Sequence, residues 1–403
     1  MGHEAAGMGG ESAKSYTLEQ ILTTALHQQQ AIALWRLPLQ TEVQACISFA
    51  PQKMSAIPAL ETSPAGFLFC PFVTDGDEPH IFLKADLHYS SHTKQLLPAA
   101  DAPEALVNSF TAALDQPETR TSAAWPIPVH TDHFKGRNEE TFTAAVSLAV
   151  DAIRAEAMEK VVLSRINTTP LPSAFSLINA FEKMLQAYPN AFVSLVAIPG
   201  IGTWMGASPE ILVSVDQQQI FKTVALAGTQ PLCEDGSTAN AIWRQKEIEE
   251  QGMVERYVLS CFKKLRLREY SEVGPRTVIA GNLMHLRTDF KVDLKEVDFP
   301  TLGTDMLRLL HPTSAVCGLP KEPALRFILN HEGYNRSYYS GFLGPVNSSD
   351  GSYQFVNLRC MQLLQHEAVL YAGAGITGDS SPEKEWQETK HKLQTMLKIL
   401  SEF

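Results

Sequence analysis

The sequence predicts a mixed α/β protein of the α+β type, with largely antiparallel sheets flanked by helices. Between Tyr16 and Pro126, short apolar runs alternate with breaks that contain Pro or Gly, a pattern typical of short strands with a few helices. Later helical and strand patterns do not alternate as βαβ units, so a parallel sheet is not expected. The 403 residues, 44% of them hydrophobic, can bury a large core.

The chain divides into three predicted parts. Residues 1–15 are polar and small, and we expect them to form a disordered tail. Residues 16–126 form an N-terminal subdomain, and residues 127–403 form the region that carries the sequence motifs described below. The joint near Pro126 and Pro128 does not have the composition of a linker, so the two regions should form one compact unit.

Hydrophobic periodicity predicts the main elements of the second region. Apolar residues at helical spacing from Phe142 to Ile153 indicate an amphipathic helix, which gives way to a β-branched strand at Lys160. Ser381 followed by Pro382 is a typical helix start, so the C-terminal stretch should be helical. Further strands are predicted at 192–198, 211–215 and 277–280, and a further helix at 241–265.

Charge and cysteine content exclude several classes of function. The formal net charge of −11 argues against a general binder of nucleic acid or of anionic membranes. An anionic small molecule would therefore need a locally basic or metal-bearing pocket. The six cysteines form no CxxC motif, which favours buried thiols in a reducing compartment. With no long apolar run and no secretion signal, we expect a cytoplasmic protein without nucleic-acid or membrane partners.

Two predicted helices each carry a pair of glutamates three residues apart, Glu247 with Glu250 and Glu385 with Glu388. This spacing puts both carboxylates of a pair on one helix face, and Lys392 follows Glu388 on the same face. Such faces are usually solvated. Alternatively, two of them could meet across a cleft and hold Mg²⁺ through hard carboxylate oxygens. The spacing alone leaves both interpretations open.

Ten short motifs follow one another between about Phe142 and Leu400. They are KVVLSR (160–165), GASPE (206–210), ALAGT (225–229), KExxE (246–250), GNLMHL (281–286), HPTSAVCGLPK (311–321), YYSG (338–341), NLR (357–359), YAGAGIT (371–377) and EWQETKHKL (385–393). In this order they resemble the chorismate-utilising enzyme family, which includes isochorismate synthases, salicylate synthases, anthranilate synthase component I and aminodeoxychorismate synthase component I. The resemblance covers about two thirds of the chain and implies that family's fold.

The resemblance also implies an acid and a base. In chorismate, a nucleophile that arrives at ring carbon 2 can expel the hydroxyl on carbon 4, which requires a base on one face and an acid on the other. By resemblance, Lys160 is the base that deprotonates water and Glu210 is the acid. From the residues alone, Lys160 could equally be an exposed residue at a helix end, and Glu210 a turn residue after Pro209.

The substrate and metal sites are implied in the same way. Arginine pairs bidentately with a carboxylate, and glycines let backbone N–H groups approach an anion, so Arg359 and the 373–375 segment should receive the enolpyruvyl carboxylate. The residues implied for substrate binding are Gly228, Thr229, His285, Ala315, Val316, Tyr339, Arg359, Gly373, Ala374, Gly375 and Lys392. Those implied for Mg²⁺, directly or through water, are Glu247, Glu250, Glu385 and Glu388. For His285, a purely structural role stays open.

Three positions discriminate among the family members. Ala227 stands where aminodeoxychorismate synthases that use an enzyme nucleophile have lysine, and Lys160 stands where ammonia-using anthranilate synthases have glutamine. Ala315 resembles isochorismate synthases, whereas salicylate synthases tend to have threonine. We therefore expect an isomerase, an isochorismate synthase (hydroxymutase) in which water attacks ring carbon 2 of chorismate and the 4-hydroxyl leaves. We also expect a monomer that needs no glutamine amidotransferase partner.

Departures from the family pattern keep alternatives open. Many isochorismate synthases have leucine in place of Val316, so a looser wall could allow pyruvate loss and make the chain a salicylate synthase. Gln251 replaces a histidine and Ile248 a common arginine, which should affect metal affinity more than metal presence. A partner-dependent chorismate-binding subunit is the third alternative. It is disfavoured because Lys160, Glu210 and all four glutamates are present.

Overall fold

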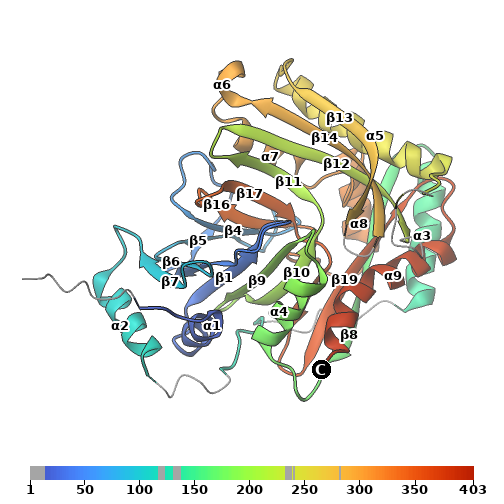
Figure 1. Ribbon diagram of the computed structural model, residues 1–403. Helices are drawn as coiled ribbons and strands as arrows, with labels where there is room; N and C mark the ends of the chain where they lie inside the picture. The colour runs from blue at the N-terminus through green and yellow to red at the C-terminus, as the bar shows by residue number, and fades with distance from the viewer. Residues whose placement is uncertain (1–13, 117–122, 130–137, 232–237, 239–240, 281–282) are drawn as a thin grey trace, which may run out of the picture.

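The fold consists of two large antiparallel sheets with helices packed on their outer faces (Figure 1). The computed structural model describes residues 14–116, 123–129, 138–231, 238, 241–280 and 283–403, without the side chains of Thr229, Pro231 and Ala280. Every strand pairing in this part of the chain is antiparallel. The predicted α+β class is confirmed.

The first sheet has ten strands within the described residues, in the order β15-β8-β19-β18-β10-β9-β1-β2-β6-β7. Their bounds are β15 (Gly318–Leu319), β8 (Lys160–Pro170), β19 (Glu367–Ile376), β18 (Cys360–Leu363), β10 (Gly202–Ser208), β9 (Phe192–Ile198), β1 (Ala31–Arg36), β2 (Gln44–Ser48), β6 (Leu87–Ser90) and β7 (Gln95–Pro98). Its outer face packs on α1 (Leu18–His27), α2 (Glu104–Leu114), α4 (Leu177–Ala187) and α9 (Pro382–Leu400).

The second sheet has nine strands in the same part of the chain, in the order β13-β14-β12-β11-β17-β16-β4-β5-β3. Their bounds are β13 (Ser271–Ala280), β14 (Leu283–Asp293), β12 (Ile220–Pro231), β11 (Ile211–Asp216), β17 (Gly351–Val356), β16 (Phe342–Val346), β4 (Gly66–Cys70), β5 (His80–Lys84) and β3 (Gln52–Met54). The remaining helices are α3 (Glu139–Arg154), α5 (Gln245–Lys264), α6 (Leu294–Val297), α7 (Leu302–Leu310) and α8 (Lys321–His331). Apolar side chains from all five join one core cluster with this sheet.

Aromatic side chains fill the space between the sheets. Phe192 of β9 stacks on Phe355 of β17 with ring centroids 4.1 Å apart, and Phe69 of β4 stacks on Tyr338 at the same distance. Such large buried rings dominate core energetics and fix how the sheets lie against each other. Strands that precede Pro126 belong to both sheets, so residues 16–126 and 127–403 share one core.

The described part of the chain contains no helix that is both long and apolar enough to cross a bilayer. Five cysteines, Cys46, Cys70, Cys261, Cys317 and Cys360, lie buried as free thiols. The sixth, Cys233, and most of the predicted N-terminal tail lie outside the described residues.

Candidate active site

One cavity collects side chains from both sheets, from α5 and from α9. It is partly open to solvent, and together with the solvent at its mouth it spans about 730 Å³. Twelve of the residues implied by the resemblance line it: Glu210, Gly228, Glu250, His285, Ala315, Val316, Tyr339, Arg359, Gly373, Gly375, Glu388 and Lys392. Motifs as far apart in the sequence as those of Val162 and Lys392 are thus brought to one site.

The other implied residues lie elsewhere. Lys160 is fully buried behind the cavity wall. Ala374 lies between two wall glycines, and because side chains alternate along a strand it points into the core. Glu385 and Glu247 are on α9 and α5 but are not wall residues. The side chain of Thr229 is outside the described part of the structure.

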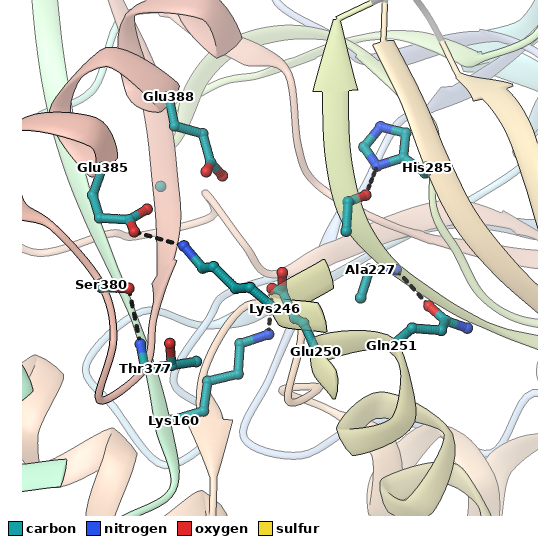
Figure 2. Close-up of polar contacts among 12 residues, drawn as sticks. Lys160, Ala227, Lys246, Glu250, Gln251, His285, Thr377, Ser380, Glu385 and Glu388 are labelled. Atoms are coloured by element: carbon teal, nitrogen blue, oxygen red, sulfur yellow. Dashed lines mark hydrogen bonds and ion pairs between the residues drawn. The ribbon is translucent and has the colours of Figure 1, made fainter. Parts of the chain in front are cut away.

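Lys160 begins β8 and forms an ion pair with Glu250 of α5, with Nζ 2.7 Å from Oε1 (Figure 2). Gly375 on the neighbouring strand β19 makes this pair possible. A Cβ atom at Gly375 would lie 2.8 Å from Oε1 of Glu250 and 3.1 Å from Cε of Lys160. The alternative of an exposed helix-end lysine is wrong, because the side chain has no solvent-accessible surface.

Glu210 lies between β10 and β11 and is buried rather than held in an exposed turn. Burial raises the pKa of its carboxyl to about 7, although the positive charges of Lys160 and Lys392 oppose the rise. A carboxyl that is partly protonated near neutral pH can donate a proton, which suits a general acid.

Lysines and glutamates form ion pairs at and behind one part of the cavity wall, to which Glu250, Glu388 and Lys392 belong. Lys246 Nζ lies 2.8 Å from Oε1 of Glu385, and Lys392 Nζ lies 2.6 Å from Oε1 of Glu388 (Figure 2 labels three of these four residues). We call this set the ionic side: Lys160, Lys246, Glu250, Glu385, Glu388 and Lys392. It joins the N-terminal halves of α5 and α9 to the start of β8.

The carboxylates of the ionic side suit a hard divalent cation in their chemistry. Burial and then the charge of Glu388 raise the pKa of Glu385, which shows two acidic groups held close with too little positive charge between them. In the part of the chain that the structure describes, no three His, Cys, Asp or Glu side chains are already gathered for a metal. Glu250, Glu385 and Glu388 therefore fit Mg²⁺ as oxygen donors, but lysine ammonium groups now bind all three.

Glu247 has a different local role. The helix that was expected from Ala241 begins at Gln245, which makes Glu247 a first-turn residue. Its Oε2 accepts a hydrogen bond of 2.8 Å from the Arg244 backbone N–H. First-turn N–H groups have no partner within the helix, so a glutamate at this position commonly folds back to satisfy one.

Positive charge gathers at the floor of the cavity. Arg359 makes no side-chain hydrogen bond or ion pair with any residue that the structure describes, so its guanidinium can receive a carboxylate. Lys392 donates to the Gly373 carbonyl over 2.8 Å. Burial, followed by the charges of Arg359 and Lys392, lowers the pKa of His285 to about 3. His285 is therefore neutral, and its Nδ1–H donates to the Gly228 carbonyl over 3.0 Å (Figure 2).

A bulge in β12 shapes the wall around Gly228. β12 continues through this point to Pro231, and its register with β14 shifts between Ala227 and Thr229. Gly228 has a φ of +61°, a conformation that glycine adopts at little cost. Gln251 Oε1 accepts the Ala227 N–H over 3.0 Å, so this glutamine holds the bulge (Figure 2).

Another part of the cavity wall is hydrophobic. We call this set the apolar side: Val162, Leu226, Ala227, Ala315, Val316 and Leu358. Tyr339 lies beside it and stacks on Tyr371 with ring centroids 5.0 Å apart. The cavity thus presents both charged groups and an apolar surface to an anionic ring compound. The apolar surface can discriminate only by the shape of that compound.

Comparison with known proteins gives matches over nearly the whole chain. A family model described as "Chorismate binding enzyme" matches residues 19–401. The vibriobactin-specific isochorismate synthase of Vibrio cholerae is 28% identical over 265 residues, which cover 64% of this chain and 66% of that protein. Isochorismate synthase EntC of Escherichia coli is 28% identical over 266 residues, 65% of this chain and 67% of EntC. The aligned segments thus span about two thirds of these relatives.

The fold is shared with solved structures. MenF, the menaquinone-specific isochorismate synthase from Escherichia coli, superposes with a TM-score of 0.74 at 21% identity, covering 96% of this chain and 92% of that chain. The family match spans all the motifs and both sheets. The resemblance seen in the sequence is therefore confirmed, and the chain belongs to the chorismate-binding enzyme family.

Proposed function

We propose that this protein is a magnesium-dependent isochorismate synthase. One observation carries the proposal: Glu210, a buried carboxyl with a raised pKa, lines a cavity whose floor is cationic, and the buried Lys160 lies behind the wall glycine Gly375 of the same cavity. The relatives named isochorismate synthases support it.

The chain's own residues can be assigned to each step. The unpaired Arg359 guanidinium binds the enolpyruvyl carboxylate in a bidentate manner, with Lys392 close by. Lys160, in its neutral amine form and therefore released from its ion pair with Glu250, takes a proton from water as the oxygen attacks ring carbon 2. Glu210 gives its proton to the hydroxyl that leaves carbon 4. Base and acid together complete the exchange of one hydroxyl position for another.

Magnesium has a defined place in this proposal. Glu250, Glu385 and Glu388 would hold it, with Glu247 able to contribute only if it releases the Arg244 N–H. When bound, Mg²⁺ supplies positive charge for the ring carboxylate of the substrate. The carboxylates and the lysines of the ionic side orient the ring carboxylate of the substrate.

Water is the nucleophile that fits this cavity. Ala227 is a wall residue, so no amine is available where aminodeoxychorismate synthases would supply one. The Ala227 N–H is bound by Gln251. We therefore propose that the protein acts without a glutamine-hydrolysing partner.

A product analysis tests the proposal. Purified protein is incubated with chorismate and Mg²⁺, and the products are separated by chromatography over time. We expect mainly isochorismate, with a trace of salicylate. Dominant salicylate would identify a salicylate synthase, and no product until a glutamine amidotransferase is added would identify a partner-dependent subunit. Either result contradicts the proposal.

A further inference from the structure

We propose that Arg336 is a positioning residue that controls which product the enzyme releases, because it fixes the two valine walls of the cavity relative to each other. The inference rests on the proposed function and extends it to a residue outside the cavity. Arg336 is 3% exposed and is not part of the cavity wall. It lies outside the ten sequence motifs.

The guanidinium joins two separate chain segments. Nη1 donates to the Val316 carbonyl over 2.8 Å, and Nη2 donates to the Val162 carbonyl over 2.7 Å. Val162 belongs to β8, the strand that begins with Lys160, and Val316 belongs to the loop that precedes β15. Both valines line the cavity. One side chain thus joins the strand and the loop at the two valines, beside a backbone hydrogen bond of 2.8 Å from the Val162 N–H to the Cys317 carbonyl.

Glu332 holds the guanidinium in place. Its Oε2 accepts from Arg336 Nε over 2.6 Å, and its Oε1 accepts from Arg336 Nη2 over 2.7 Å. Oε1 also accepts from the Ser164 backbone N–H over 2.6 Å and from Ser164 Oγ over 2.7 Å. A buried ion pair offsets its desolvation only when such additional hydrogen bonds are made. This carboxylate has four, so the orientation of Arg336 is tightly determined.

Two further contacts extend the network. The Arg336 guanidinium lies 4.3 Å from the ring centroid of Phe72, which closes its remaining face. The Tyr339 backbone N–H donates to the Arg336 carbonyl over 2.9 Å, and Tyr339 is itself a wall residue. Three wall residues are therefore attached to one arginine.

The position of these walls matters for the choice of product. In pyruvate elimination, the bond between ring carbon 3 and the ether oxygen breaks. The hydrogen on carbon 2 moves to the enolpyruvyl methylene, which becomes the methyl group of pyruvate, and the ring becomes aromatic salicylate. No added acid, base or oxidant is needed. The step requires only that the side chain folds over carbon 2, so a wall that prevents this conformation suppresses it.

Arg336→Lys tests the inference. Lysine keeps a positive charge beside Glu332 but cannot donate in fixed directions to two carbonyls. We expect the ratio of salicylate to isochorismate to rise by about tenfold, the scale of a small change in pocket packing, with KM little changed. Glu332→Gln should shift the ratio in the same direction. An unchanged ratio in folded Arg336→Lys protein overturns the inference.

Arg36→Lys is the matched control. Arg36 is also buried, at 5% exposure, and donates to the carbonyls of Leu185, Tyr188 and Ala191 over 2.7, 2.6 and 3.0 Å. None of these residues lines the cavity. This variant should lose stability without any shift in the product ratio. Equal shifts in both variants would show a general effect of destabilisation and overturn the inference.

Amide hydrogen exchange separates this inference from the proposed function. The Cys317 N–H donates to the Thr313 carbonyl over 2.8 Å, so amides of residues 313–317 report on the loop directly. Arg336→Lys should speed their exchange relative to Arg36→Lys. If the native chain makes neither product, the proposed function is wrong. Amide exchange then still tests whether Arg336 positions the loop. Unchanged exchange at 313–317 overturns that role.

Discussion

The ionic side and the apolar side of the cavity are held together in different ways. On the ionic side, long side chains from β8, α5 and α9 form ion pairs that a substrate or a cation can replace. On the apolar side, the carbonyls of Val162 and Val316 accept hydrogen bonds from the buried guanidinium of Arg336. A substrate cannot replace these bonds without displacing a buried side chain. Under the proposed function, we infer that the ionic side determines whether chorismate reacts and that the apolar side determines which product leaves.

The largest effect should come from removing a carboxylate of the ionic side. Glu250→Gln leaves Lys160 without its anionic partner and removes an oxygen donor for Mg²⁺, so turnover should fall to the background rate without unfolding. Glu388→Gln should do the same. Steady-state kinetics measures the turnover of both variants, and circular dichroism measures whether they are folded.

Glu249→Gln on the same helix is the control, since Glu249 is exposed and forms a hydrogen bond only with Gln245 among the described residues. Full activity of Glu250→Gln in chelator-treated buffer would contradict the assignment of the ionic side.

Loss of the acid or the base should cost less than loss of the metal site. Lys160→Ala and Glu210→Gln should each lower kcat by about a hundredfold or more, the usual scale for a positioned proton-transfer group. Binding of chorismate should weaken less than turnover. Near-normal kcat in Lys160→Ala would mean that water is activated elsewhere.

On the apolar side, substitutions should change the product more than the rate. Val316→Ala enlarges the cavity beside the ring, and Val316→Leu fills it; such methylene changes are worth roughly 1–3 kcal/mol. We expect the salicylate fraction to rise in the first variant by about tenfold and to fall in the second. Chromatography of both reactions measures this. A large loss of kcat with an unchanged product ratio would break the division between the two sides.

The smallest effect concerns pH. Glu210 must be protonated to act as the acid, and its pKa of about 7 means that the acid form is lost as the pH rises through neutrality. In the native protein kcat should therefore decline above pH 7, by about tenfold for each further pH unit once the acid form is minor. In Glu210→Gln this decline should be absent. If the decline persists in that variant, another group is responsible.

Local sequence patterns predicted the elements well where one stretch determines its own structure. The apolar stripe from Phe142 to Ile153 became α3, Ser381 and Pro382 begin α9, and the apolar run 192–198 became β9. The family motifs also predicted most of the cavity wall. These signals are local patterns or short sequence motifs, so they can be recognised without knowledge of tertiary contacts.

Features that depend on contacts between distant segments could not be predicted. The spacing of Glu247 and Glu250 put both on one face, but the helix begins four residues later than expected, so Glu247 caps it instead. The effect of Gln251 on metal affinity stays a prediction, but the bonds of its side chain to the backbone of β12 gave no signal in the sequence. Arg336 and Glu332 gave no signal, because an i, i+4 charge pair in a sequence is usually exposed.

The central claim is that water from the solvent replaces the 4-hydroxyl by attack at ring carbon 2. Turnover in oxygen-18-labelled water tests it most directly. The account predicts isochorismate with one labelled oxygen, located in the hydroxyl on carbon 2, and the original hydroxyl oxygen released to the solvent. Isochorismate that forms at the normal rate without the label would show that the hydroxyl migrates within the substrate, and would contradict the roles given to Lys160 and Glu210.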